Sequence, residues 1–117
     1  MNMKVLLDTN FMLIPFQEKV DVYEEIKFLV PKAELITLRS CVEELKKLKK
    51  KGALQLMKLK GVKVVKGRGR GTDEQILNYL EEEGAILATL DKELMRKVLK
   101  RGQHVITLRQ SKKVVLL

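Results

Sequence analysis

Residues 4–11 read Lys-Val-Leu-Leu-Asp-Thr-Asn-Phe, an apolar run that ends in three polar residues. Residues 5–7 show no alternation of polar and apolar side chains, which is typical of a strand buried on both faces of a parallel sheet. Asp8, Thr9 and Asn10 favour turns and helix N-caps, so we expect a helix to begin here. The Asp8 carboxylate would then lie at the carboxyl end of the strand, where open α/β sheets bind ligands. Taken alone, helix capping is the commoner role of such an aspartate.

The size and composition of the chain indicate one globular domain spanning residues 1–117, with 45% hydrophobic and 33% charged residues. No apolar stretch is long enough for a membrane span or a signal peptide, so we expect a cytoplasmic protein without membrane contact. The single cysteine, Cys41, excludes an internal disulfide. The single histidine, His104, excludes a ribonuclease that uses two histidines and leaves too few ligands for zinc.

The net charge of +9 points to a polyanionic partner, with nucleic acid as the first candidate. A surface rich in lysine for solubility, or in lysine and glutamate as in thermophiles, would give the same composition. The charge therefore supports a nucleic-acid partner without establishing one.

Alternating strand and helix patterns continue along the chain. After the first strand, we expect strands at residues 34–38, 62–66, 85–90 and 104–108, with a further edge strand at 114–117. Helices are expected at residues 21–30, 40–59, 72–83 and 91–100. Ser40 should cap the second of these helices, Thr72 and Gln75 should form a capping box on the third, and Gly84 should close it. This alternation predicts a three-layer α/β/α sandwich around a parallel five-stranded sheet, with the first strand central and a cleft at its carboxyl end.

Two further aspartates are expected at the same edge of the sheet. Asp91 follows the fourth strand as Asp8 follows the first, and Asp73 opens a helix on the same side. Neighbouring carboxylates repel each other unless a cation lies between them, and hard oxygen ligands suit Mg²⁺ or Mn²⁺. For Asp73, favourable charge at a helix N-terminus is an equally good explanation.

Helical geometry distinguishes the adjacent glutamates Glu43 and Glu44 of the basic helix expected at residues 40–59. Its apolar stripe consists of Cys41, Val42, Leu45 and Leu48. At about 100° per residue, Glu44 lies on the flank of this stripe while Glu43 points away from it. Glu44 is therefore the glutamate expected to reach the cleft.

At these acidic positions the chain resembles the PIN-domain family of metal-dependent nucleases. The resemblance rests on Leu6-Leu7-Asp8-Thr9-Asn10, Glu44-Leu45, Thr72-Asp73 and Ala88-Thr89-Leu90-Asp91, in that order along nearly the whole chain. Residues 7–17 with 40–45 look most like the branch that contains rRNA-processing endonucleases and their archaeal relatives, and VapC-type toxins belong to the same superfamily. One departure is Leu90, where many members carry a polar residue.

This resemblance implies a PIN-like fold and hydrolysis of RNA phosphodiester bonds by a metal-activated water. Asp8, Asp73 and Asp91 would hold Mg²⁺ or Mn²⁺, and Glu44 would assist the metal or the water. Thr9, Asn10 and Thr89 would orient these carboxylates, although Thr9 and Asn10 also suit a turn. RNA is the expected partner, alongside an antitoxin or a ribosome-assembly factor and a second copy in a homodimer.

Basic side chains near the expected cleft are candidates for binding RNA. Gly67-Arg68-Gly69-Arg70-Gly71 should be flexible and lie on the cleft side, so that Arg68 and Arg70 can follow a phosphate backbone. The other candidates are Lys46, Lys49, Lys92 and Arg96. These four residues equally suit solvated helix faces.

Two other functions remain open from the sequence. The first is an inactive RNA-binding module with the same fold, in which the aspartates serve only as caps. The second is a phosphoryl-handling α/β protein, such as a receiver or an aspartate-nucleophile phosphatase. This second function fits less well because Lys66 and Asn10 stand where those proteins need acidic residues.

Overall fold

A single mixed sheet forms the centre of the computed structural model, which describes residues 2–117. Its strands are β1 (Lys4–Leu7), β2 (Glu34–Leu38), β3 (Lys63–Val65), β4 (Ile86–Ala88), β5 (Val105–Arg109) and β6 (Lys113–Leu116). They are arranged in the order β3-β2-β1-β4-β5-β6. The first five strands are parallel, and β6 pairs antiparallel with β5. The expected α/β/α sandwich is confirmed, and its sixth strand is the additional edge strand expected from the C-terminal tail.

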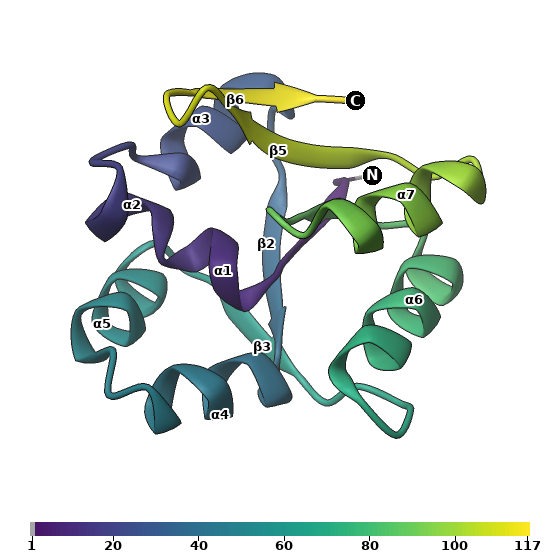
Figure 1. The fold of residues 1–117 in the computed structure, drawn as a ribbon, viewed down its shortest axis with the longest axis horizontal. Coiled ribbons are helices and arrows are strands. Elements are labelled where there is room, and N and C mark those ends of the chain that lie inside the picture. Colours follow the sequence, from purple (N-terminus) through teal and green to yellow (C-terminus); the bar gives the residue numbers. More distant parts are fainter. Residues whose placement is uncertain (1) are drawn as a thin grey trace.

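Helices cover both faces of this sheet. They are α1 (Thr9–Met12), α2 (Ile14–Gln17), α3 (Val22–Leu29), α4 (Arg39–Lys47), α5 (Lys51–Leu59), α6 (Thr72–Glu83) and α7 (Lys92–Lys100). The chain runs from β1 outward to β3, returns through α6 to β4, and then proceeds to β5. Because parallel crossovers are right-handed, this reversal puts α6 and α7 on the face opposite α1 to α5 (Figure 1). None of the helices in residues 2–117 combines the length and apolarity needed to cross a bilayer.

Strand β1 lies at the point where the strand order reverses, between β2 and β4. Its residues 5–7 are fully buried, as expected for a central parallel strand. Leu7 stands beside Thr37 of β2 and Ala88 of β4. The three strands therefore end together, and the residues that follow them meet at one edge.

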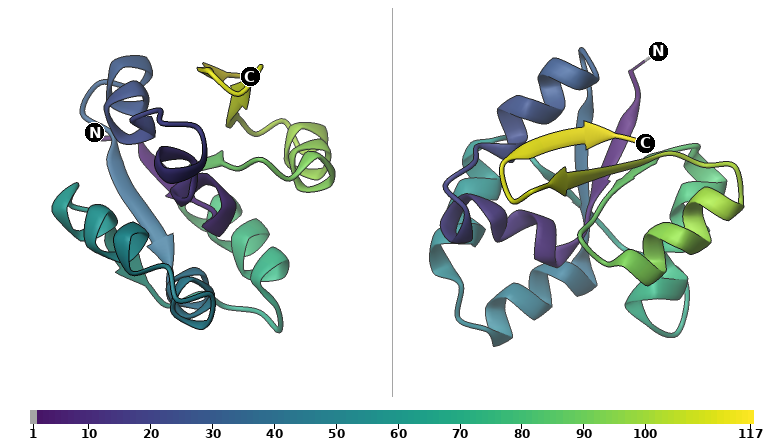
Figure 2. Two further views of the ribbon diagram at one scale, coloured as in Figure 1. Left: turned by 60° about the vertical axis from the view of Figure 1, so that its left-hand side comes forward. Right: turned by 45° about the horizontal axis from the view of Figure 1, so that its top comes forward.

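The C-terminal tail forms the edge strand β6, as predicted, and this strand runs antiparallel to β5. The hairpin between β5 and β6 turns through Gln110 and Ser111, which both adopt positive φ angles, 54° and 55°. Val114 is buried, and β6, at the edge of the sheet opposite β3, packs against α3 (Figure 2). Strand β6 thus covers the edge of β5, which would otherwise be exposed.

The basic helix predicted for residues 40–59 is two helices. The backbone N–H groups of Lys49 and Lys50 donate to the carbonyls of Lys46 and Leu45, and Lys49 has a φ of 54°. This is a Schellman motif, which normally carries glycine at the position of Lys49, so the local sequence does not indicate a helix end here. As a result, Leu48 falls at the end of α4 and is 51% exposed rather than buried.

The predicted caps of α4 and α6 are wrong. Helix α4 begins at Arg39, so Ser40 lies inside its first turn. Gly71 occupies the N-cap of α6 and there is no capping box, because the Gln75 side chain is bonded elsewhere. The predicted end of this helix is confirmed, with Gly84 in the left-handed conformation at φ 62°.

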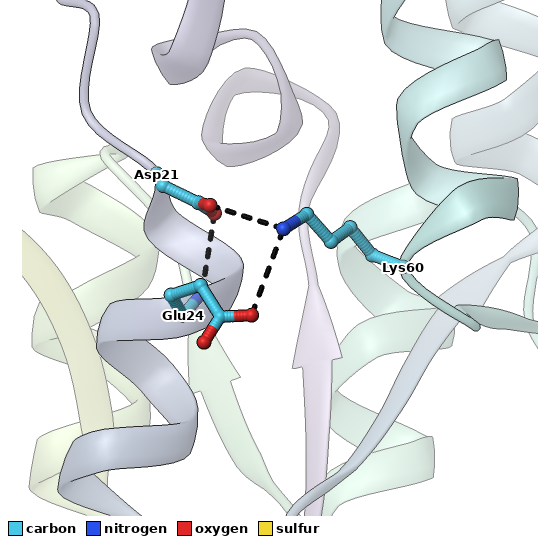
Figure 3. Close-up of polar contacts among 3 residues, drawn as sticks. All are labelled: Asp21, Glu24 and Lys60. Atoms are coloured by element: carbon cyan, nitrogen blue, oxygen red, sulfur yellow. Dashed lines mark hydrogen bonds and ion pairs between the residues drawn. The ribbon is translucent and has the colours of Figure 1, made fainter.

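A three-residue polar contact joins α3 to the end of α5 (Figure 3). The Lys60 ammonium lies 3.0 Å from Asp21 Oδ2 and 3.6 Å from Glu24 Oε1. Asp21 also caps α3, because its Oδ1 accepts a hydrogen bond from the Glu24 N–H at 3.2 Å. Partial burial opposes ionisation of Asp21, but the hydrogen bonds and the charge of Lys60 outweigh it and lower the pKa of this carboxyl.

Candidate active site

The centre of the candidate site is the pair Asp8 and Thr89, which follow the adjacent strands β1 and β4. Asp8 is 9% exposed and Thr89 is fully buried. The Thr89 hydroxyl donates to Asp8 Oδ2 at 2.7 Å, and the Thr9 N–H donates to Asp8 Oδ1 at 2.8 Å. Asp8 is therefore the N-cap of α1, as expected from its sequence, and it also faces the neighbouring strand.

Asn10 and Asp91 extend this arrangement into one hydrogen-bonded network. The Asp91 N–H donates to the Thr89 hydroxyl at 3.1 Å, and Asn10 Oδ1 accepts from the Leu90 N–H at 3.1 Å. Asn10 contacts the backbone of Leu90, so this hydrogen bond does not depend on a polar side chain at residue 90. Asp91 in turn caps α7 with Oδ1, which accepts from two backbone N–H groups. Its other oxygen has no hydrogen bond within residues 2–117.

Glu44 and Asp73 bring further negative charge to Asp8. Burial raises the pKa of Asp8, hydrogen bonds from Thr89 and Thr9 oppose the shift, and the charges of Asp73 and Glu44 raise it further. Both of these residues are exposed and lie on helices that begin at the same edge of the sheet. Across residues 2–117, none of the four acidic residues of this corner is paired with a basic side chain.

The chemistry of this corner fits a divalent cation. Within residues 2–117, the structure does not bring three acidic, histidine or cysteine side chains close enough to form a ready-made metal cage. Mg²⁺ does not require one, because it keeps several waters and is commonly held by one or two carboxylates. A buried carboxylate with two acidic neighbours and no basic partner is an oxygen donor set that a cation would stabilise.

A pocket of about 380 Å³ with polar and charged lining residues lies between α4 and α6, beside the acidic corner. Its lining residues are Ser40, Glu43, Glu44, Lys47 and Thr72. The sequence does not single out Lys47, because every lysine of residues 46–51 has the same local pattern. The neighbouring Lys46 does not line the pocket, but it is paired at 3.5 Å with Glu43, which does. Lys47 is therefore the lysine of α4 that faces this pocket.

The glycine-arginine segment is held in place rather than free. Side chains of α6 bond its backbone at Arg68, Gly69 and Arg70. Arg68 is paired with Glu82, whereas the exposed Arg70 side chain has no ion pair or hydrogen bond within residues 2–117. The expectation of a flexible loop is wrong, because its glycines allow close packing on α6.

The other predicted RNA-binding residues are less closely connected to the corner. Lys49 lines a groove between α2 and α5. Lys92 and Arg96 are exposed on α7, and Lys92 directly follows Asp91. Cys41 lies on the buried face of α4, where burial raises the pKa of its thiol.

The α/β/α sandwich places the acidic residues of this corner at the point of strand reversal, which is where open α/β folds bind their ligands. Residues 5–111 match the family described as "PIN like domain", so this chain belongs to the PIN-like domain family. The predicted family resemblance is therefore confirmed.

Two curated relatives are similar over nearly the full chain. Ribonuclease VapC4 from Methanocaldococcus jannaschii is 38% identical, with 93% of this chain and 92% of the relative covered. Ribonuclease VapC9 from Archaeoglobus fulgidus is 32% identical, with 93% and 85% covered.

The fold also matches a solved structure, that of the PIN domain endonuclease Utp24. The TM-score is 0.82 at 23% identity, and the match covers 97% of this chain and 90% of the other. At this level of identity the match supports the shared fold alone.

Proposed function

We propose that this chain is a divalent-metal-dependent endoribonuclease that hydrolyses RNA phosphodiester bonds. The observation that carries the proposal is Asp8, a buried carboxylate at the strand reversal with two acidic neighbours and no basic partner within residues 2–117. The VapC relatives are named as ribonucleases, which gives this acidic corner its substrate class.

Each acidic residue has a role in the proposed site. Asp8, Asp73 and Asp91 would hold Mg²⁺ or Mn²⁺, and Glu44 would orient the attacking water. Thr89 and Asn10 fix Asp8 and the backbone before Asp91 by hydrogen bonds. When bound, the cation would activate the water and neutralise charge that develops on the phosphate.

The biological setting favoured by sequence is a VapC-type toxin, because both curated relatives carry that name at 32% identity or more. A role in rRNA processing, suggested by the resemblance of residues 7–17 and 40–45 to that branch of the family, is the alternative. In the toxin setting an antitoxin protein is the expected partner.

The surface offers such a partner an apolar groove between α2 and α5. Leu13, Phe16 and Ala53 line it, and the lysines at positions 49–51 form its basic side. Phe16 is 54% exposed, and its ring lies over Gly52. An acidic amphipathic segment of the antitoxin fits this combination of apolar contact and positive charge.

The test separates metal binding from cleavage. Calorimetric titration of Mn²⁺ into the protein without RNA should show binding to the wild type and loss of binding in Asp8→Asn. Cleavage of single-stranded RNA should need Mn²⁺ or Mg²⁺, stop with EDTA, and be lost in the same variant.

The inactive RNA-binding module gives a different outcome. Such a protein would bind RNA equally well with and without Mn²⁺, bind no metal at Asp8, and leave the RNA intact. That combination would overturn the proposed nuclease.

A further inference from the structure

The Gln75 side chain joins two parts of the molecule that are distant in sequence. The Ser40 hydroxyl donates to Gln75 Oε1 at 3.1 Å, and Gln75 Nε2 donates to the Gly69 carbonyl at 3.1 Å. Ser40 lies in the first turn of α4, and Gln75 lies in the first turn of α6. One amide therefore connects both helices to the segment formed by residues 66–71, called here the arginine loop.

Two glycines of the arginine loop let it pack directly on Gln75. A Cβ atom at Gly67 would lie 2.6 Å from Gln75 Oε1 and 2.8 Å from Gln75 Cβ. Gly69 has a φ of +142°, and its Cβ would lie 3.1 Å from the Gln75 backbone nitrogen. A Cβ atom at Gly71 would meet nothing within 4 Å. The first two glycines are thus needed for close approach, whereas the third is not.

Further bonds from α6 fix the loop and leave one arginine available. Asn78 Nδ2 donates to the Arg68 carbonyl at 2.6 Å, and the Arg70 N–H donates to Glu74 Oε2 at 3.2 Å. Arg68 itself is paired with Glu82. Within residues 2–117, the Arg70 guanidinium has no such partner and is exposed.

We propose that Gln75 is a positioning residue that holds the arginine loop so that Arg70 is a preformed contact for an RNA phosphate. This inference rests on the proposed function. A loop fixed before binding avoids the entropy cost of being ordered by the ligand, which increases affinity without any new contact. Gln75 suits this role because Asp73 lies two residues before it, while Glu44 lies one turn after Ser40. The same amide therefore ties the loop to both helices that carry acidic residues.

The effects of Arg70 and Gln75 on RNA binding should differ in kind. Binding of single-stranded RNA is measured in EDTA, to prevent cleavage, by fluorescence anisotropy across a salt series. Arg70→Ala removes a phosphate contact and should reduce the slope of log affinity against log salt by about 0.7. Gln75→Ala should weaken binding about fivefold, the effect of about one net hydrogen bond, with the slope unchanged. A Gln75→Ala affinity equal to that of the wild type would overturn the proposal.

A double-mutant cycle distinguishes positioning from a general structural effect. If Gln75 acts through Arg70, Gln75→Ala should cause no further loss in the Arg70→Ala background. An equal loss in both backgrounds would show that Gln75 acts elsewhere and would overturn the proposal. Gln55→Ala, on the exposed face of α5, is the control for replacing a glutamine by alanine.

Glycine variants provide an independent test of the same loop geometry. Gly67→Ala should reproduce the affinity loss of Gln75→Ala, because its Cβ pushes the loop away from α6. Gly71→Ala should have a smaller effect, and equal effects would contradict the geometry. The proposed function is tested separately. It fails if the wild-type protein cleaves no RNA in Mn²⁺, whatever effect the loop variants have on RNA binding.

Discussion

Thr89 gives the sharpest test of how the acidic corner is built. Thr89→Val keeps the shape of the side chain but removes the hydroxyl that donates to Asp8 at 2.7 Å and accepts from the Asp91 N–H at 3.1 Å. A hydrogen bond to a charged group contributes about 1.5–3 kcal/mol, and a neutral one about 0.5–1.5 kcal/mol. The buried methyl group offsets about 0.8 kcal/mol of this loss. We therefore expect the free energy of unfolding to fall by about 2–3 kcal/mol.

Urea denaturation at pH 7 in EDTA, followed by circular dichroism, measures this change without any contribution from bound metal. Thr107→Val on β5 is the matched control, because no hydrogen bond of the Thr107 hydroxyl is present in residues 2–117. It should change the free energy of unfolding by less than about 0.5 kcal/mol. RNA cleavage by Thr89→Val should fall about 10- to 100-fold, the usual effect of losing a group that orients a metal ligand. Equal stability of the two variants would refute the role of this hydroxyl.

The remaining predictions concern charge in the corner and at the cap of α3. The pKa of Asp8 is raised mainly by burial, so folding loses stability as the pH rises from about 4, the unfolded value, through the folded pKa. Asp8→Asn should abolish cleavage, because it removes a proposed metal ligand. It should also raise the melting temperature at pH 7 in EDTA, because no charge is then buried, and this gain should be absent below about pH 4. A lower melting temperature of the variant at pH 7 would contradict this explanation. Glu44→Gln should reduce single-turnover cleavage about 10- to 100-fold and lower the pKa of Asp8 measured by NMR. Glu43→Gln should do neither, and equal effects would show that the helix phase is wrong. Asp21→Ala should lower the free energy of unfolding by about 1 kcal/mol by removing a helix cap. Because the pKa of Asp21 is lowered, its ionic contribution is present above about pH 4 and is lost as the pH falls through the folded pKa. A difference from wild type that is as large at pH 3 as at pH 7 would reject the ionic part of this explanation.

Local patterns were sufficient to predict the central strand and the position of Asp8. Residues 5–7 are apolar without alternation, and a polar turn follows at once, so the strand, its burial and its end are all encoded within one short segment. The same holds for the end of α6, where Gly84 takes a conformation that few other residues adopt easily. Strand order also predicted that acidic residues would lie at this edge, because parallel strands place their carboxyl ends together; Asp73 and Glu44 do act on the charge of Asp8, although residues 2–117 hold no three-ligand cluster.

Only the tertiary structure decided how the polar side chains are paired. Thr72 and Gln75 have the spacing of a capping box, but Gln75 bonds Gly69 and, from 35 residues away, Ser40. Thr89 was predicted as an orienting residue, while its bond to Asp8 across 81 residues became visible only when β1 and β4 were paired. Sequence periodicity reports which face of an element is buried, whereas the partner of a polar group depends on which other group the fold brings within about 3 Å.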